Sequence, residues 1–309
     1  MSLPTKDHCE EKNAHDAETS NGGQEHPFYV DTHYIKALLY WNETANEHDN
    51  TKKFFDDVLP EILPEPVTGK SFFNVLGVGS GTGKIDLHIL STIQKLRPDL
   101  KIYSETIEPT KEEIDLYKAS VSNTPELSNV TFTWHNKSVV EYEADVKQNN
   151  TAKKFDLIHM VQMLYYVKPV KETLEFLKSL LSPEGRLVIV VLSGECGWVK
   201  MFRNNIYPSN QDFNLDLDSD QTTDILDAIV MRYEIHDIDS FMDVTGLVEG
   251  REDSELLLDV IMDEAEFAKT ASPDLKAQLM ADLQDPEFTF RKDGKIWLDT
   301  RVKGIVARH

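Results

Sequence analysis

The sequence has 309 residues, 40% of them apolar, and its 32 basic and 54 acidic side chains give a formal net charge of −22. This charge repels nucleic-acid and anionic membrane surfaces but attracts small cations. The two cysteines, Cys9 and Cys196, exclude a disulfide framework or a cysteine-based zinc site. No apolar run is long enough to span a bilayer and the first residues lack a signal-peptide core, so we expect a cytoplasmic protein.

The first part of the chain changes from a polar tail to a regular alternation of strands and helices. Residues 1–26 are polar and are predicted to be disordered. Helical patterns follow at 34–48 and 50–63. The predicted strands are then 71–78, 101–109, 130–136, 154–164 and 186–193, and the predicted helices among them are 85–96, 110–121 and 170–181. This alternation with short connections predicts an α/β fold, a mostly parallel sheet with helices on both faces.

From about Gly194 the pattern is less regular. It predicts acidic helices around 219–231, 254–267 and 273–283, and late strands at 233–239 and 295–307 that could extend the sheet in the antiparallel direction. We expect one domain over 27–309, with a cofactor-binding core at about 54–200 and a substrate subdomain built from about 27–53 and 200–290.

The first predicted strand ends in a loop with glycines at 77, 79, 81 and 83. A nucleoside-triphosphate loop would need Ser or Thr after its lysine, but Lys84 is followed by Ile85. The dinucleotide fingerprint G-x-G-x-x-G also fails, because the third glycine comes one position early. The remaining pattern, G-x-G-x-G, lets the backbone pass close under an adenosine ligand whose polar tail faces the next helix. A glycine-rich turn that only joins strand to helix is the alternative.

The second predicted strand ends in Glu108 and Pro109, 25 residues past Gly83. A doubly wound fold places at this point a carboxylate that accepts hydrogen bonds from ribose hydroxyls. The alternative is a strand-end acid that faces water. Together the loop and Glu108 indicate S-adenosylmethionine, whose sulfonium cation suits an acidic site.

Segments from about Phe28 onward resemble the histamine N-methyltransferase family. They are "KIDLHIL", "EP" after the second strand, "FTWH", "DLIHMVQMLYYVK", "SGECGW" and "PDLKAQLMADLQDPEF". The most specific is Asp156–Lys168, because generic methyltransferases share the glycine loop but not "HMVQMLYYV". The resemblance implies a seven-stranded class I methyltransferase core with a smaller substrate domain, and methylation of histamine on the ring nitrogen distal to its side chain.

The loop and the resemblance together assign the cofactor to Gly79, Gly81, Gly83, Glu108 and Val161. Two further positions depart from the family. Glu113 matches an adenine-side glutamine, and Val139 matches a serine that occurs one place earlier here, as Ser138. We include Glu113 and Ser138 among the expected cofactor contacts.

For the methyl acceptor, the resemblance implies a site made of Glu47, Gln162 and an aromatic wall. The wall contains Tyr29, Tyr166 and Phe202, the last in place of a tryptophan. A late asparagine of the family aligns with Thr300 or, shifted by one, with Asp299.

The roles of these residues leave alternatives open. Glu47 can pair with an ammonium group or be a solvated charge at a helix end, and Gln162 can hydrogen-bond the acceptor ring or satisfy loop backbone. Of the adjacent Tyr165 and Tyr166, one is expected to face the pocket and the other the core. His159 lies within a predicted strand and is expected to be a packed residue.

The expected reaction needs little acid–base chemistry. A neutral imidazole already offers a lone pair, and its pKa of about 6.5 leaves most molecules uncharged at neutral pH. We therefore assign no catalytic residue and no metal, and expect a monomer that acts on a small-molecule amine without a nucleic-acid or membrane partner. A different amine or imidazole acceptor, such as a histidine-containing dipeptide, and a non-catalytic cofactor-binding relative remain the alternatives.

Overall fold

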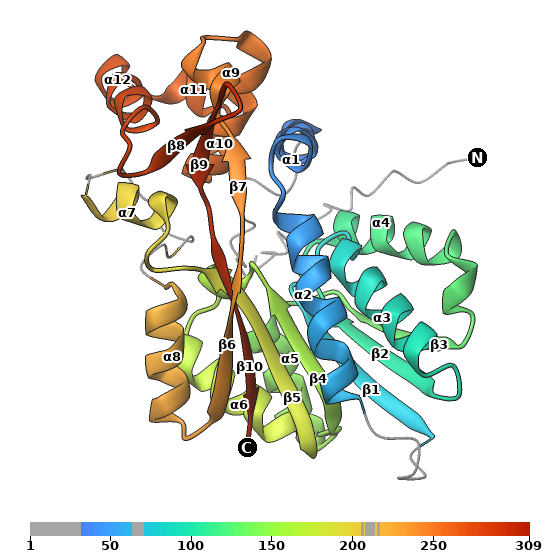
Figure 1. Cartoon of the computed structure of the whole chain (residues 1–309). Coiled ribbons are helices and arrows are strands. Elements are labelled where there is room, and N and C mark those ends of the chain that lie inside the picture. Colours follow the sequence, from blue (N-terminus) through green and yellow to red (C-terminus); the bar gives the residue numbers. More distant parts are fainter. Residues whose placement is uncertain (1–31, 64–70, 205–206, 208–213, 215–216) are drawn as a thin grey trace, which may run out of the picture.

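The computed structural model describes residues 32–63, 71–204, 207, 214 and 217–309. The predicted tail and Tyr29 therefore lie outside the described residues. The described chain forms a seven-stranded sheet and a separate three-stranded sheet, which stands at one end of the larger one (Figure 1). Within these ranges no helix has the length and apolar character needed to cross a membrane.

The seven-stranded sheet has the order β3-β2-β1-β4-β5-β10-β6. Its strands are β1 (Phe72–Val78), β2 (Lys101–Ile107), β3 (Val130–His135), β4 (Phe155–Val161), β5 (Leu181–Leu192), β6 (Arg232–Ile238) and β10 (Val302–Arg308). The five strands from β1 to β5 pair in parallel, whereas β10 is antiparallel to both β5 and β6. The seven-stranded, mostly parallel class I methyltransferase fold expected from the sequence is thereby confirmed.

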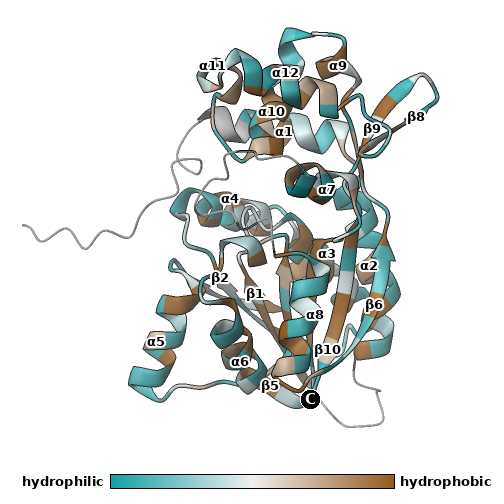
Figure 2. Ribbon diagram, turned by 90° about the vertical axis from the view of Figure 1, so that its left-hand side faces the viewer, coloured by the Kyte–Doolittle hydropathy of each residue, from teal (hydrophilic) through white to brown (hydrophobic). Residues whose placement is uncertain are grey.

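Helices cover both faces of this sheet, so its central strands are buried on both sides. In Figures 1 and 2, α2 (Glu47–Ile62) and α3 (Lys84–Leu96) lie on one face, and α5 (Val139–Asn149), α6 (Val170–Leu180) and α8 (Ser219–Ala228) lie on the other. The first six residues of β4, Phe155 to Met160, are all buried, as its nearly continuous apolar run predicts. The helix α4 (Lys111–Ser122) follows β2.

The remaining elements gather above the carboxyl ends of the parallel strands (Figure 1). The small sheet has the order β7-β9-β8. Its strands are β7 (Phe241–Asp243), β8 (Thr289–Lys292) and β9 (Lys295–Asp299), and the nearby helices are α1 (Thr32–Thr44), α7 (Gly197–Asn204), α9 (Thr245–Val248), α10 (Leu256–Met262), α11 (Phe267–Thr270) and α12 (Pro273–Asp282). Short 3-10 turns occur at η2 (Pro125–Leu127), η3 (Leu164–Tyr166) and η4 (Glu252–Glu255). The boundary expected near residue 200 does not follow the sheet, because α8 and β6 belong to the main sheet layer.

The strand order places a crevice between β1 and β4. From β1 the chain proceeds outward to β2 and β3, and then returns to the other side of β1 to form β4. In open α/β sheets, ligands bind outside the carboxyl ends of the strands at such a reversal.

The first predicted helix, 34–48, is interrupted in the structure. The helix α1 ends at Thr44, and Ala45 pairs with Met242 of β7. The side chain of Asn46 then accepts a hydrogen bond of 2.8 Å from the backbone of Phe241. This pairing with a distant strand, which helical periodicity cannot show, makes Glu47 the first residue of α2.

The late strand predicted over 295–307 is divided between the two sheets. Its first part is β9 of the small sheet, and its second part is β10 of the main sheet. At the junction, the hydroxyls of Thr300 and Ser240 are 2.7 Å apart and buried. Ser240 lies between β6 and β7, which pass between the two sheets in the same way.

Several further elements differ from the sequence prediction, among them α5 and β5. The helix α5 was not predicted, although a capping box between Ser138 and Glu141 marks its start. The strand β5 begins at Leu181, ahead of the start predicted at 186, and the pairing register with β4 shifts in this added part.

Candidate functional site

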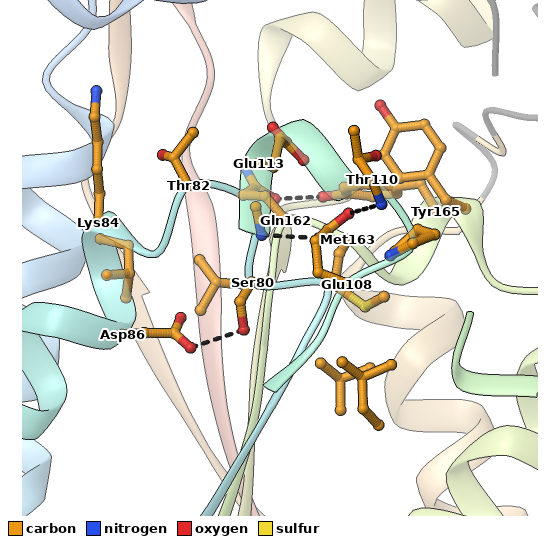
Figure 3. Close-up of a pocket in the computed structure, with 18 of the residues that line it drawn as sticks. Ser80, Thr82, Lys84, Asp86, Glu108, Thr110, Glu113, Gln162, Met163 and Tyr165 are labelled. Carbon is orange, nitrogen blue, oxygen red and sulfur yellow. Dashed lines mark hydrogen bonds between the residues drawn. The ribbon is translucent and has the colours of Figure 1, made fainter. Parts of the chain in front are cut away.

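A cavity of about 1080 Å³ lies at the carboxyl ends of β1, β2 and β4. Its walls also include Trp41 of α1, Val260 of α10 and Asp263 just after α10, so it lies between the main sheet and the elements above it. Figure 3 shows the side that is formed by the glycine loop, Glu108 and Gln162. The volume is at the upper end of the range for a single small ligand, which leaves room for a cofactor and a small acceptor together.

The glycine loop after β1 forms one wall of this cavity through Gly79 and Gly81. Both have positive φ angles, 64° and 53°, which side chains rarely adopt. A Cβ atom on Gly81 would lie 3.6 Å from the carboxyl group of Glu113, so the loop backbone itself faces the cavity. The loop ends at the N-terminus of α3, where backbone N–H groups favour an anionic group.

Gly83 has a different role from the other two glycines. It is not among the residues that line the cavity. A Cβ atom at this position would lie 2.2 Å from the ring of Tyr117, a buried residue of α4. Gly83 therefore lets α3 begin close against α4. For this one glycine, the structure supports the alternative of a turn that only packs strand and helix together.

The carboxylate of Glu108 is held by backbone donors on both oxygens. Gly81 donates to Oε2 at 2.8 Å and Thr110 donates to Oε1 at 2.9 Å. A carboxylate has about four lone-pair sites, so these two bonds fix its orientation and leave acceptor capacity for a ribose diol. Burial raises the pKa of Glu108, and the backbone hydrogen bonds from Thr110 and Gly81 oppose that rise.

Glu113, on the first turn of α4, lies next to Glu108. Burial raises the pKa of Glu113 to about 8, and the charge of Glu108 and a hydrogen bond to it act in the same direction. At neutral pH Glu113 is therefore a neutral acid that can donate a hydrogen bond, as the glutamine implied by the resemblance also can. Ser138 and Val161 line the cavity as well.

The buried carboxyl group of Asp86 holds the glycine loop through Ser80. Ser80 donates a hydrogen bond of 2.7 Å to Asp86, as Figure 3 shows. The ring of His159 lies 3.7 Å from the same carboxylate. Burial lowers the pKa of His159, and Asp86 opposes that change. His159 is thus a packed residue of β4 with a carboxylate neighbour, in agreement with its expected role.

Glu47 and Gln162 approach each other. Glu47 is 3% exposed at the N-terminus of α2, and Gln162 follows directly after β4. Burial raises the pKa of Glu47 to about 7, while a hydrogen bond from the side chain of Gln162 acts in the opposite direction. The two side chains belong to the same cavity as the glycine loop.

The backbone at Gln162 turns its side chain out of the line of β4. Its φ angle is 52°, in the left-handed region that non-glycine residues seldom adopt. Its N–H donates to the carbonyl of Val190 in β5 at 2.9 Å, which holds it in this conformation. Such strain is typical of functional positions and is consistent with a site role for this residue.

Most of the residues expected from the sequence meet in this one cavity. They are Glu47, Gly79, Gly81, Glu108, Glu113, Ser138, Val161, Gln162 and Tyr166. Both Tyr165 and Tyr166 line it, although only one was expected to do so. The hydroxyl of Tyr166 donates to Asp263 at 3.2 Å.

Three expected acceptor residues are not brought to the cavity. Phe202 packs against Tyr207, with ring centroids 5.0 Å apart, and is not part of the lining. Thr300 is 1% exposed and bonds Ser240 between the two sheets, and Asp299 pairs with Arg301. Tyr29 lies outside the described residues.

The cavity also contains residues that the sequence did not indicate. Trp41 packs edge-on against His48, with ring centroids 5.1 Å apart. Burial lowers the pKa of His48 to about 4, as do the charges of Lys84 and Lys52. Asp263 follows α10 and has no recognisable motif around it. Among the residues that the structure describes, no group of three His, Cys, Asp or Glu side chains could hold a metal ion.

The cavity fits an adenosine-containing sulfonium cofactor. Glycine backbone, a buried carboxylate after β2 and a helix N-terminus lie side by side along one wall. On the β2 side of the cavity, the side chain of Asn136 donates a hydrogen bond of 2.6 Å to the carbonyl of Pro109. Glu47 and Gln162 line the same cavity and could hold an acceptor.

Comparison with known proteins agrees with this arrangement. A family model described as a methyltransferase domain matches residues 46–240. Histamine N-methyltransferase A of Xenopus laevis is 37% identical over 277 residues, which are 89% of this chain and 94% of that protein. The histamine N-methyltransferase of Cavia porcellus is 37% identical over 275 residues, 88% of this chain and 94% of that protein. Carnosine N-methyltransferase 2 of Gallus gallus is 35% identical over 277 residues, 89% of this chain and 86% of that protein.

Proposed function

We infer the reaction of this protein from its family and its cavity, because the chain belongs to the histamine N-methyltransferase family. It is an S-adenosylmethionine-dependent N-methyltransferase. Its acceptor is a small imidazole amine, and the cavity supports histamine best, with transfer to the ring nitrogen distal to the side chain.

The observation that carries this proposal is the pair formed by Glu47 and Gln162 inside the cofactor cavity. A buried carboxylate costs free energy unless a cation or hydrogen-bond donor compensates it. The ammonium group of histamine supplies such a cation, in a charge-assisted bond worth about 1.5 to 3 kcal/mol. The net charge of −22 also attracts a cationic acceptor to the protein.

The residues of the chain contribute position rather than proton transfer. When bound, S-adenosylmethionine supplies a sulfonium-activated methyl group that a nitrogen lone pair can displace in line. The neutral acceptor ring already has that lone pair, so no residue has to act as a strong base. Glu47 holds the amine, Gln162 orients the ring, and Glu108 fixes the ribose, and this alignment lowers the barrier.

A histidine-containing dipeptide such as carnosine is a second candidate acceptor. A relative named for carnosine is similar over the same share of the chain as the histamine enzymes. In addition, the exposed Lys84 lines the cavity close to His48 and could receive the carboxylate of a dipeptide. Against this candidate, the carboxyl groups in the lining outnumber the lysines, which disfavours an acceptor that carries a negative charge.

We further propose that the protein is a cytoplasmic monomer without a nucleic-acid partner, since its net charge of −22 repels nucleic acid. The proposed cofactor core is about 54–200 together with α8 and β6, which belong to the main sheet layer, and the substrate subdomain comes from about 27–53 and the rest of 200–290.

The two candidate acceptors are separated by their kcat/KM values with labelled cofactor. We expect histamine to be preferred over carnosine by at least about tenfold, or ~1.4 kcal/mol. Lys84→Ala should leave the value for histamine unchanged, because histamine has no carboxylate, and should lower the value for carnosine if Lys84 binds the carboxylate of the dipeptide. A preference for carnosine that Lys84→Ala selectively removes would show instead that the acceptor is a histidine-containing dipeptide.

A further inference from the structure

A chain of hydrogen bonds extends from the end of β5 toward Glu47. The backbone N–H of Leu192 donates to the hydroxyl of Tyr165. That hydroxyl donates to Oε1 of Gln162 at 2.7 Å, as Figure 3 shows. The side chain of Gln162 in turn lies in the same cavity as Glu47 and lowers the pKa of its carboxyl group, against the effect of burial. Three buried or half-buried side chains therefore lie in series between the sheet and the acceptor end of the cavity.

The direction of this chain is fixed at its origin. A backbone N–H can only donate, so the oxygen of Tyr165 accepts from Leu192 and its own proton is available for Gln162. Burial raises the pKa of Tyr165, so the hydroxyl keeps this proton. The amide oxygen of Gln162 thus faces Tyr165, and its nitrogen is left for Glu47.

We propose that Tyr165 is a positioning residue for acceptor binding: it holds the Gln162 amide with its nitrogen toward Glu47, which keeps Glu47 a carboxylate able to receive an ammonium group. If the amide were reversed, its oxygen would face the carboxyl group and favour the protonated acid. The inference rests on the proposed function, because it concerns how that site binds a cationic amine.

The strand β5 holds Gln162 at two points, which explains why Tyr165 has this role. The backbone N–H of Gln162 bonds Val190, and its side chain connects to Leu192 through Tyr165. Pairing of β4 with β5 stops at Val161 and Val190, so no β4 carbonyl is paired with the N–H of Leu192. The Tyr165 hydroxyl takes that position. Tyr166, the adjacent residue, bonds Asp263 instead.

A double-mutant cycle tests the proposal with Tyr165→Phe, Gln162→Ala and the combined variant. If Tyr165 acts through Gln162, each single variant raises the KM for histamine by about tenfold, and the combined variant is no worse than Gln162→Ala alone. Cofactor affinity should stay within about twofold in all three, and 4-methylimidazole, which lacks the amine, should be affected less. Tyr166→Phe is the matched control, and its effect should multiply with that of Gln162→Ala.

A combined effect of about a hundredfold would show that Tyr165 and Gln162 act independently, and would overturn the proposal. Tyr165→Phe also leaves the N–H of Leu192 without the hydroxyl, which costs stability, so a second measurement uses the unaltered protein. Hydrogen exchange of the Gln162 side-chain amide, assigned by its loss in Gln162→Ala, should be slow relative to that of the exposed Gln148. Equal exchange rates would contradict a held amide. If the unaltered protein methylates no imidazole amine, the proposed function fails, whereas the exchange result still reports on the amide.

Discussion

The amide of Gly81 and the carboxylate of Glu108 are joined by a hydrogen bond of 2.8 Å, which connects the loop after β1 to the end of β2. The residue that is placed to hold the ribose therefore also holds the loop that passes under the cofactor. Loss of this carboxylate should affect both features at once.

We expect Glu108→Ala to weaken binding of S-adenosylmethionine and of the demethylated product S-adenosylhomocysteine equally, because both carry the same ribose. Charge-assisted hydrogen bonds of about 1.5 to 3 kcal/mol predict a loss of roughly one to two orders of magnitude in each Kd by calorimetry. Glu126→Ala, which removes an exposed carboxylate outside the cavity, is the control. A loss confined to the methylated cofactor would remove Glu108 from the ribose site.

Glu113 should make the ligand-free protein less stable as the pH rises from acidic values to about 8. Its folded-state pKa of about 8 exceeds its usual value of 4.5, so the unfolded chain loses the proton first and stability falls between about pH 4.5 and about pH 8. Glu113→Gln should therefore reduce the fall in Tm between about pH 5 and about pH 8. The matched control is Glu112→Gln, which alters the exposed neighbour. If Glu113→Gln shows the same fall in Tm as Glu112→Gln and the unaltered protein, then Glu113 and Glu108 do not share a buried site.

Glu47 should make the binding of a cationic acceptor depend on pH. Its pKa is about 7, so below this value it is largely neutral, and the KM for histamine should fall as the pH rises from about 6 to about 8. The acceptor rings also lose their protons in this range, and the ammonium group of histamine lowers the pKa of its ring, so each KM is expressed as the concentration of acceptor with a neutral ring. The ratio of these corrected KM values isolates Glu47.

In Glu47→Gln we expect the KM for histamine to rise by one to two orders of magnitude, about 1.4 to 2.8 kcal/mol, and the ratio to lose its pH dependence. Glu43→Gln, at an exposed position of α1, should behave as the unaltered protein. An equal rise in KM for both acceptors would exclude an ammonium contact at Glu47.

Thr300 should contribute to stability and not to acceptor binding. Thr300→Val removes one of two buried hydroxyls 2.7 Å apart and leaves that of Ser240 without this partner. The expected cost is about 1 to 3 kcal/mol in urea unfolding, with the KM for histamine unchanged. Thr133→Val, at an exposed position of β3, should cost little. A raised KM in a stable Thr300→Val protein would instead place Thr300 at the acceptor, as the sequence resemblance implies.

Several parts of the site that the sequence indicated follow directly from strand ends, whereas Glu47 and Glu113 were implied by the family resemblance alone. The glycine loop after β1, Glu108 after β2 and Gln162 after β4 reach one cavity because parallel strands end at one edge of a sheet. The contributions from the upper elements could not be predicted in the same way. Trp41 and Asp263 reach the cavity through long-range packing, and no local pattern specifies that packing.

The wrong assignments of Thr300 and Gly83 also come from packing that the local sequence does not show. Thr300 is kept from the cavity by the division of one predicted strand between two sheets, which the apolar pattern of 295–307 does not show. Gly83 fits the glycine motif, but the ring of Tyr117 accounts for it. A motif match therefore identified the loop correctly without distinguishing the glycine that packs from those that line the cavity.

The proposed reaction is tested by incubating the protein with histamine and S-adenosylmethionine carrying a ¹³C-labelled methyl group, and following the product by NMR. We expect one new labelled N-methyl signal, on the ring nitrogen distal to the side chain, with formation that depends on Glu108 and Gln162. Absence of any labelled imidazole amine, together with efficient labelling of an uncharged acceptor, would contradict the proposed reaction.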